Sequence, residues 1–138
     1  MILFLDASAL VKRYVNEARS DEVRDAIATA RPVISRLSQV EVASALARRF
    51  RDGSISASVY ARILDQLHRD LERFDVVELT PAVATQSEGL LGRHPLRASD
   101  ATQLASCLVL ERELQLSLRF LAYDERLTAA AAAEGLVA

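Results

Sequence analysis

Short apolar runs alternate with amphipathic segments along the whole chain. Each run has the length of a buried strand, and each is followed by a stretch in which apolar side chains recur at helical spacing. The runs are residues 2–5, 33–35, 76–79 and 119–123, with a last short one at 136–138. Strands that alternate with helices pair in parallel through right-handed crossovers. The sequence therefore predicts one α/β domain over residues 1–138, a short parallel sheet of about five strands flanked by helices.

Helix-ending and helix-opening residues divide the amphipathic segments. Gly53 ends the longest early segment, and Thr80 followed by Pro81 gives the cap and first residue of a later one. We expect helices over residues 8–16, 20–30, 38–51, 56–73, 81–92, 99–113 and 124–133. In the third of these, we expect the inward face to carry Val40, Ala43, Ala47 and Phe50.

The composition is that of a globular protein. Hydrophobic residues make up 51% and charged residues 26% of the 138 residues, and no apolar run approaches the roughly 18 residues that a membrane helix needs. The lone cysteine, Cys107, is expected to be buried; because it cannot form a disulfide within the chain, we expect a reducing cytoplasm. We expect His68 and His94 at the surface. The net charge of −2 argues against indiscriminate nucleic-acid binding.

Four acidic residues stand where strands end or helices begin. They are Asp6, Glu41, Asp100 and Asp124. Taken singly, each has a structural explanation: Asp6 and Asp124 could cap helices, Glu41 could complete a capping box with Ser38, and Asp100 could favour the positive end of a helix dipole. These alternatives stay open for each residue alone.

Taken together, the four acids point to a metal site. The carboxyl ends of parallel strands meet at one edge of a sheet, where open sheets hold their ligands. Carboxylates gathered there repel one another unless a cation lies between them, and Mg²⁺ prefers oxygen ligands. Two such ions could activate a water and stabilise the leaving oxygen of a phosphodiester. Other acids, such as Asp70, are expected on solvated helix faces.

Four segments, in this order, resemble the PIN-domain ribonucleases, and specifically the VapC-type toxins of bacterial toxin–antitoxin pairs. The segments are residues 5–10 (LDASAL), 40–46 (VEVASAL), 96–101 (LRASDA) and 120–127 (FLAYDERL). The resemblance covers nearly the whole chain. It implies a PIN-like three-layer fold and a magnesium-dependent endoribonuclease that hydrolyses RNA with a water activated by the cation. It also implies inhibition by a small antitoxin protein, and pairing into a homodimer.

The same resemblance assigns roles to single residues. It makes Asp6, Glu41, Asp100 and Asp124 the catalytic, metal-binding quartet for Mg²⁺, with Mn²⁺ able to substitute. Ser8 stands where the family carries a hydroxyl or amide side chain, so it would orient a water or a phosphate. The chain departs from the family at Ala122, where a hydroxyl often precedes the fourth acid by two residues.

Alternatives remain at the level of residues and of function. Arg97 is expected either to contact phosphate or to pair with one of the acids, and the Arg48–Arg51 cluster either to contact phosphate or to end a solvated helix. A receiver domain would need two adjacent acids after the first strand, and a dehalogenase-like phosphatase would need an acid at Ser8. The strongest rival is a catalytically inactive PIN-like module that binds RNA or protein.

Overall fold

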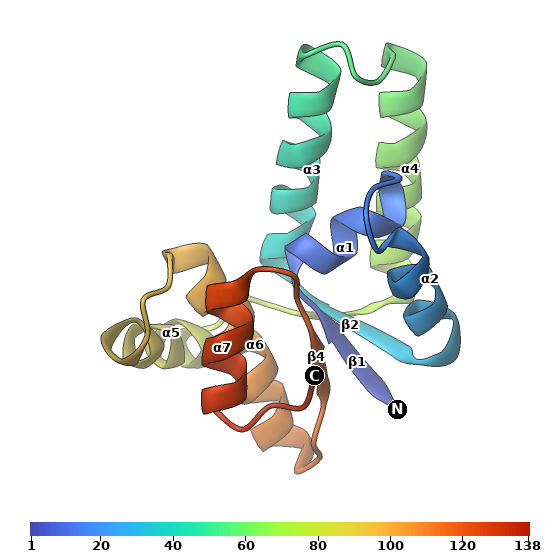
Figure 1. Ribbon diagram of the computed structural model, residues 1–138. Helices are drawn as coiled ribbons and strands as arrows, with labels where there is room; N and C mark the ends of the chain where they lie inside the picture. The colour runs from blue at the N-terminus through green and yellow to red at the C-terminus, as the bar shows by residue number, and fades with distance from the viewer.

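The computed structural model describes residues 1–138 as a four-stranded parallel sheet with helices on both faces (Figure 1). The strands lie in the order β3-β2-β1-β4. They are β1 (Ile2–Leu5), β2 (Arg31–Ser35), β3 (Asp75–Val77) and β4 (Arg119–Leu121). The helices are α1 (Ala7–Tyr14), α2 (Ser20–Thr29), α3 (Arg36–Arg51), α4 (Ala57–Arg73), α5 (Pro81–Arg93), α6 (Ala98–Leu114) and α7 (Glu125–Ala133). The predicted α/β three-layer fold is confirmed.

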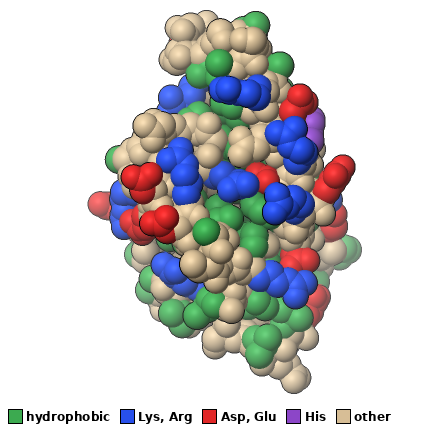
Figure 2. All heavy atoms as spheres, turned by 90° about the vertical axis from the view of Figure 1, so that its right-hand side faces the viewer, with side chains coloured by type: hydrophobic (Ala, Val, Ile, Leu, Met, Phe, Trp, Pro, Cys, Tyr) green, Lys and Arg blue, Asp and Glu red, His purple; other side chains and the backbone are tan.

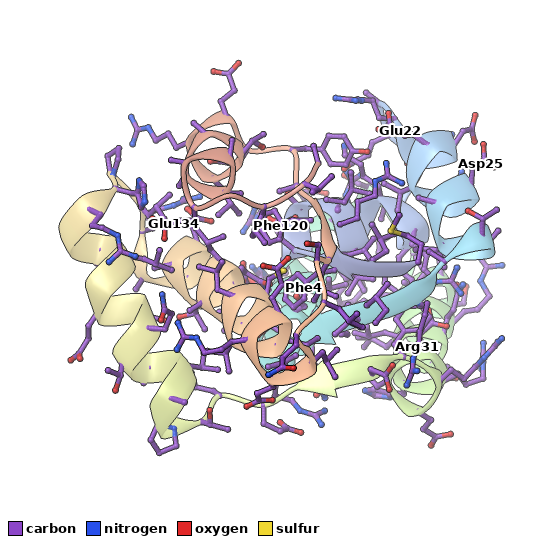
Figure 3. The ribbon with its side chains drawn as sticks, turned by 90° about the horizontal axis from the view of Figure 1, so that it is seen from below. Phe4, Glu22, Asp25, Arg31, Phe120 and Glu134 are labelled. Carbon is purple, nitrogen blue, oxygen red and sulfur yellow. The ribbon has the colours of Figure 1, made fainter.

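Alternation along β1 divides the interior into two cores. Leu3 and Leu5 point toward α1–α4, and Phe4 points to the opposite face, toward α5–α7. Phe4 stacks on Phe120 of β4, with ring centroids 5.7 Å apart, and the two rings lie together between the sheet and α6 (Figure 3). Burying such a side chain completely stabilises the fold by about 1.5–3 kcal/mol. The central strand is thus held by apolar packing on both faces.

The parallel sheet brings the starts of several helices to one edge. Because all strand pairs are parallel, their carboxyl ends share that edge, and the first turns of α1, α3, α6 and α7 lie there (Figure 1). Helices α3 and α4 run antiparallel and project from this end, and Phe50 stacks on Tyr60 between them. Gly53, with φ of +83°, turns the chain from one to the other.

The strand count differs from the five strands predicted. Residues 136–138 contribute only an isolated parallel bridge between Val137 and Arg119. The strand expected at 76–79 instead ends at Val77, because its partner β2 ends at Ser35, the residue paired with Val77. Leu79, beyond that last pair, is 60% exposed.

Helix α3 begins earlier than predicted and presents a different face to the interior. Ser35 is its N-cap and accepts a hydrogen bond from the Leu37 amide at 3.1 Å, so the capping box with Ser38 is wrong. Val40, expected inside, is 64% exposed. The buried residues of this helix are Ser38, Val42 and Leu46. Ser38 lies on the buried face because it accepts a hydrogen bond from Gln103 of α6, a contact that the apolar pattern of α3 alone does not reveal.

Asp70 is also misplaced by the sequence analysis, which put it on a solvated face. It is 3% exposed, and its carboxylate accepts hydrogen bonds from Arg13 Nε and Nη2 at 2.7 and 3.0 Å and from the Tyr14 hydroxyl at 2.7 Å. Because Arg13 and Tyr14 end α1, this network fastens α4 to the helix that follows β1.

The remaining expectations concern single side chains. Cys107 is fully buried and His68 is exposed, as predicted. His94 is not a free surface residue, because its Nε2 lies 2.6 Å from Glu134 Oε2 at the end of α7. Crossing a membrane would require a longer and more apolar helix than any in this structure.

Candidate active site

Asp6 stands at the carboxyl end of the central strand, where it is both a cap and a buried acid. It is 3% exposed, and its Oδ1 accepts hydrogen bonds from the Ala9 amide at 2.9 Å and from Ser8 Oγ at 2.7 Å. Burial, together with the negative charge of Glu41, raises the pKa of Asp6 to about 6 against the lowering effect of these bonds. Asp6 therefore caps α1 and also binds its proton more tightly than an ordinary aspartate does.

Ser8 connects the ends of the two strands that carry the first and last acids. Its hydroxyl donates to Asp6 and accepts a hydrogen bond from the Tyr123 amide at 3.0 Å. Tyr123 immediately precedes Asp124, so one hydroxyl fixes the chain after β1 against the chain after β4. The structure places Ser8 beside Asp6. Its predicted role, orienting a water or a phosphate, stays a prediction.

Glu41 and Asp100 approach each other from facing helices. Glu41 is half-buried on α3, and Asp100, with 15% of its side chain exposed, lies in the first turn of α6. Burial raises the pKa of Glu41, a hydrogen bond from Gln103 lowers it, and the charge of Asp100 raises it again. These effects mean that the two carboxylates repel each other across the gap between the helices.

Arg97 lies at the rim of the site. Its Nε is 3.4 Å from Asp100 Oδ2, which makes the ion pair that was one of its two expected roles. The side chain is 79% exposed, and at that exposure a salt bridge stabilises by about 1 kcal/mol or less. Most of its donors therefore stay free for another partner.

Asp124 caps α7 and faces the same hollow as Asp100. Its Oδ1 accepts a hydrogen bond from the Leu127 amide at 2.9 Å. A hollow of about 480 Å³ is lined by Pro95, Arg97, Asp100, Tyr123, Asp124, Glu125 and Arg126. A larger hollow of about 630 Å³ lies along β4 and α7 and shares Tyr123 with it, but it contains none of the four predicted acids. The smaller hollow is the one relevant to the predicted chemistry.

The four carboxylates fit a hydrated divalent ion better than a closely packed cluster. Asp6 is coupled electrostatically to Glu41, and Glu41 to Asp100, while Asp124 shares a hollow with Asp100. No three acidic, histidine or cysteine side chains lie close enough together to hold one metal ion directly. Mg²⁺ is commonly bound through one or two carboxylates and keeps several waters. The oxygen-only donor set and its uncompensated repulsion both suit such an ion.

Gln103 is the residue of this site that sequence reasoning missed. It is 1% exposed on α6, and its Nε2 donates to Ser38 Oγ at 2.9 Å and to Glu41 Oε1 at 3.0 Å. A usable signal was present, because Gln103 follows Asp100 by three residues and so lies on the same helix face. The surrounding apolar run masked it, since a polar residue there is equally compatible with a solvated position.

A known protein family matches nearly the whole chain. The family model described as "PIN domain" matches residues 3–133. None of the curated proteins compared with the chain matches it.

Solved structures of similar fold include proteins from three organisms. VapC20 of Mycobacterium tuberculosis, described as a sarcin-ricin loop cleaving toxin, has 20% identity and a TM-score of 0.70, with 98% of this chain and 96% of that chain covered. A toxin–antitoxin complex from Klebsiella pneumoniae has 15% identity and a TM-score of 0.62, covering 90% and 88%. PAE2754 of Pyrobaculum aerophilum has 22% identity and a TM-score of 0.63, covering 99% and 83%. At these identities the likeness concerns the fold.

Proposed function

The chain belongs to the PIN-domain family, and on that premise we propose that it is a divalent-metal-dependent endoribonuclease, the toxin of a type II toxin–antitoxin pair. One observation supports the proposal: carboxylates from the end of β1, the second turn of α3 and the starts of α6 and α7 lie toward one edge of the sheet without a protein cation to neutralise them all. The exposed Arg97 pairs weakly with Asp100 alone. Repulsion of this kind is relieved by a bound divalent ion.

Each of the residues has its own role in such a site. Asp6, Glu41, Asp100 and Asp124 would hold Mg²⁺ or Mn²⁺. A divalent ion at this position supplies charge that lowers the pKa of water and offsets negative charge on the phosphate. Asp6 would hold such an ion in its ionised form, which predominates near neutrality because its pKa is about 6. Ser8 keeps the Asp6 carboxylate in one orientation by donating to Oδ1.

RNA would be bound through phosphate and shape. Arg97 lies beside Asp100 with a largely exposed guanidinium, whose planar fork suits a phosphate of the substrate. Aromatic residues make up only 5% of the chain, so few rings can stack on bases. On the face that carries α2 and α4, Lys and Arg side chains lie in several places with acidic side chains between them (Figure 2). Such a mixed surface suits selective recognition better than general affinity for RNA.

A small antitoxin is the proposed protein partner. Support comes from the fold that this chain shares with a toxin–antitoxin complex of Klebsiella pneumoniae. Pairing into a homodimer and a cytoplasmic location complete the proposal and remain predictions.

The test uses the purified protein and total cellular RNA. Wild type, Asp100→Asn and a control, Asp65→Asn on the exposed side of α4, are incubated with Mg²⁺ or Mn²⁺ and then with EDTA, and new 5′ ends are mapped by sequencing. We expect a few metal-dependent ends with wild type and the control, and none with Asp100→Asn. A well-folded Asp100→Asn protein that still cleaves would overturn the site. A folded wild type that binds Mn²⁺ and cuts nothing would favour an RNA- or protein-binding module.

A further inference from the structure

Two polar pairs face each other between α3 and α6. Ser38 and Glu41 are three residues apart on α3, and Asp100 and Gln103 are three residues apart on α6, so each pair occupies one helix face. Gln103 joins the pairs through its two hydrogen bonds to Ser38 and Glu41. We infer that Gln103 is a positioning residue that holds the Glu41 carboxylate beside Asp100 in readiness for a divalent ion, an inference that rests on the proposed function.

The orientation of the Gln103 amide is fixed by its partners. An ionised carboxylate only accepts hydrogen bonds, so the side facing Glu41 must be the NH₂ group. The other amide atom, Oε1, is buried and has no hydrogen-bond partner. Leaving a buried acceptor unpaired destabilises a fold by about 1–3 kcal/mol. An apolar side chain would avoid that cost but would leave both Ser38 and Glu41 without their donor, so the glutamine is explained by the two groups that it holds on α3.

The need for such a restraint follows from the charges around Glu41. Asp100 repels it, and Glu41 is only half-buried, so its side chain has room to turn toward solvent. The bond from Gln103 opposes that movement and keeps Oε1 of Glu41 on the α6 side. A ligand already in place loses less conformational entropy when the ion binds. Removal of comparable supporting hydrogen bonds weakens metal affinity by roughly 10- to 100-fold.

The experiment measures Mn²⁺ binding itself, by isothermal titration calorimetry on the full chain. Gln103→Met keeps a similar length without polar atoms, and Gln103→Asn keeps the amide but is one methylene too short to reach Glu41. Ser106→Ala is the control, because Ser106 lies one turn further on α6, is fully buried, and bonds only to the Thr102 carbonyl. Circular dichroism establishes which variants are folded, and cleavage rates are followed as a function of Mn²⁺ concentration.

We expect both Gln103 variants to raise the Mn²⁺ dissociation constant about tenfold. The Mn²⁺ concentration for half-maximal cleavage should rise in parallel, while the rate at saturating Mn²⁺ and the KM for RNA stay near wild type. The control should bind Mn²⁺ as wild type does. Equal dissociation constants in wild type and whichever Gln103 variant folds would overturn the inference and leave the proposed function intact. A wild type that binds no Mn²⁺ would overturn both.

Discussion

Asp6 and Asp70 are equally buried, each 3% exposed, but only Asp70 is paired with a positively charged side chain. Asp70 receives a two-pronged hydrogen bond from the Arg13 guanidinium and a third bond from Tyr14. Asp6 accepts hydrogen bonds from a hydroxyl and a backbone amide on Oδ1, and the charge that acts on its pKa is that of another acid, Glu41. One aspartate is neutralised by the protein and the other is not.

This difference distinguishes an aspartate that stabilises the fold from one that is suited to binding a cation. A buried charge with a permanent partner fixes two helices and has no capacity left for a ligand. A buried carboxyl without a cation retains its proton more strongly, as the pKa of Asp6 near 6 reflects, and destabilises the fold whenever it is ionised. Such a group is expected where an external cation completes the site.

The largest effect should come from breaking the Asp70 network. In Asp70→Ala, the guanidinium of Arg13 and the hydroxyl of Tyr14 lose their shared acceptor in a largely buried setting. We expect the free energy of unfolding to fall by about 3 kcal/mol, measured by urea denaturation. Arg13→Met in the same background should recover part of the loss; a loss below about 1 kcal/mol would show that the network contributes little.

Asp6→Asn should have the opposite sign. Because the pKa of Asp6 is raised from 3.8 to about 6, the folded state binds more protons than the unfolded state between those values, and stability falls as pH rises through that window. Asparagine keeps the Oδ1 acceptor and removes the charge. In EDTA we therefore expect the variant to be more stable than wild type at pH 7 by up to about 3 kcal/mol.

At pH 4 most of that advantage should be lost, since folded Asp6 is then protonated and the unfolded carboxyl is close to its own pKa of 3.8. Denaturation curves of both proteins at the two pH values measure the difference directly. An advantage that is the same at pH 4 and pH 7 would contradict the pKa assignment.

Mn²⁺ should stabilise the wild-type protein in a pH-dependent way. Near pH 7.5 the acids are available as ligands, whereas at pH 5 Asp6 is mostly protonated and Glu41, whose pKa is also raised, competes for protons. An ion at a hundredfold excess over its dissociation constant stabilises by about 2.7 kcal/mol. We expect a clear gain in Tm at pH 7.5 and a much smaller one at pH 5. Equal gains would place the binding elsewhere.

Ser8→Ala should produce the smallest change. It removes the donor to Asp6 and leaves the Tyr123 amide without its acceptor, which should lower the free energy of unfolding by about 1 kcal/mol. Because the Ser8 hydroxyl lowers the pKa of Asp6, its loss should move the pH window of instability upward. Thermal denaturation between pH 5 and pH 8 in EDTA tests this; an unmoved window would show that the hydroxyl leaves the proton affinity of Asp6 unchanged.

What could be predicted from the sequence depended on local signals. The apolar run at 2–5 and the capping pair Thr80–Pro81 predicted their elements correctly, because chain-local preferences decide them. Asp70 and Ser38 were misjudged because the partners that bury them, Arg13 and Gln103, are 57 and 65 residues away. The four acids lie toward one sheet edge, and their role as a metal site stays a prediction; their mutual spacing depends on how the helices pack, which no local pattern encodes.

The pairing of β1 with β4 has a consequence for synthesis of the chain. The first strand to leave the ribosome pairs early with β2 but acquires its second neighbour only after Arg119–Leu121 has been made, and the bond between Ser8 and Tyr123 spans 115 residues. Asp6 and Asp124 therefore share an edge only in a finished domain. A nascent fragment lacks the last of the four acids and the strand that precedes it, so these side chains come to one edge only when the domain is complete.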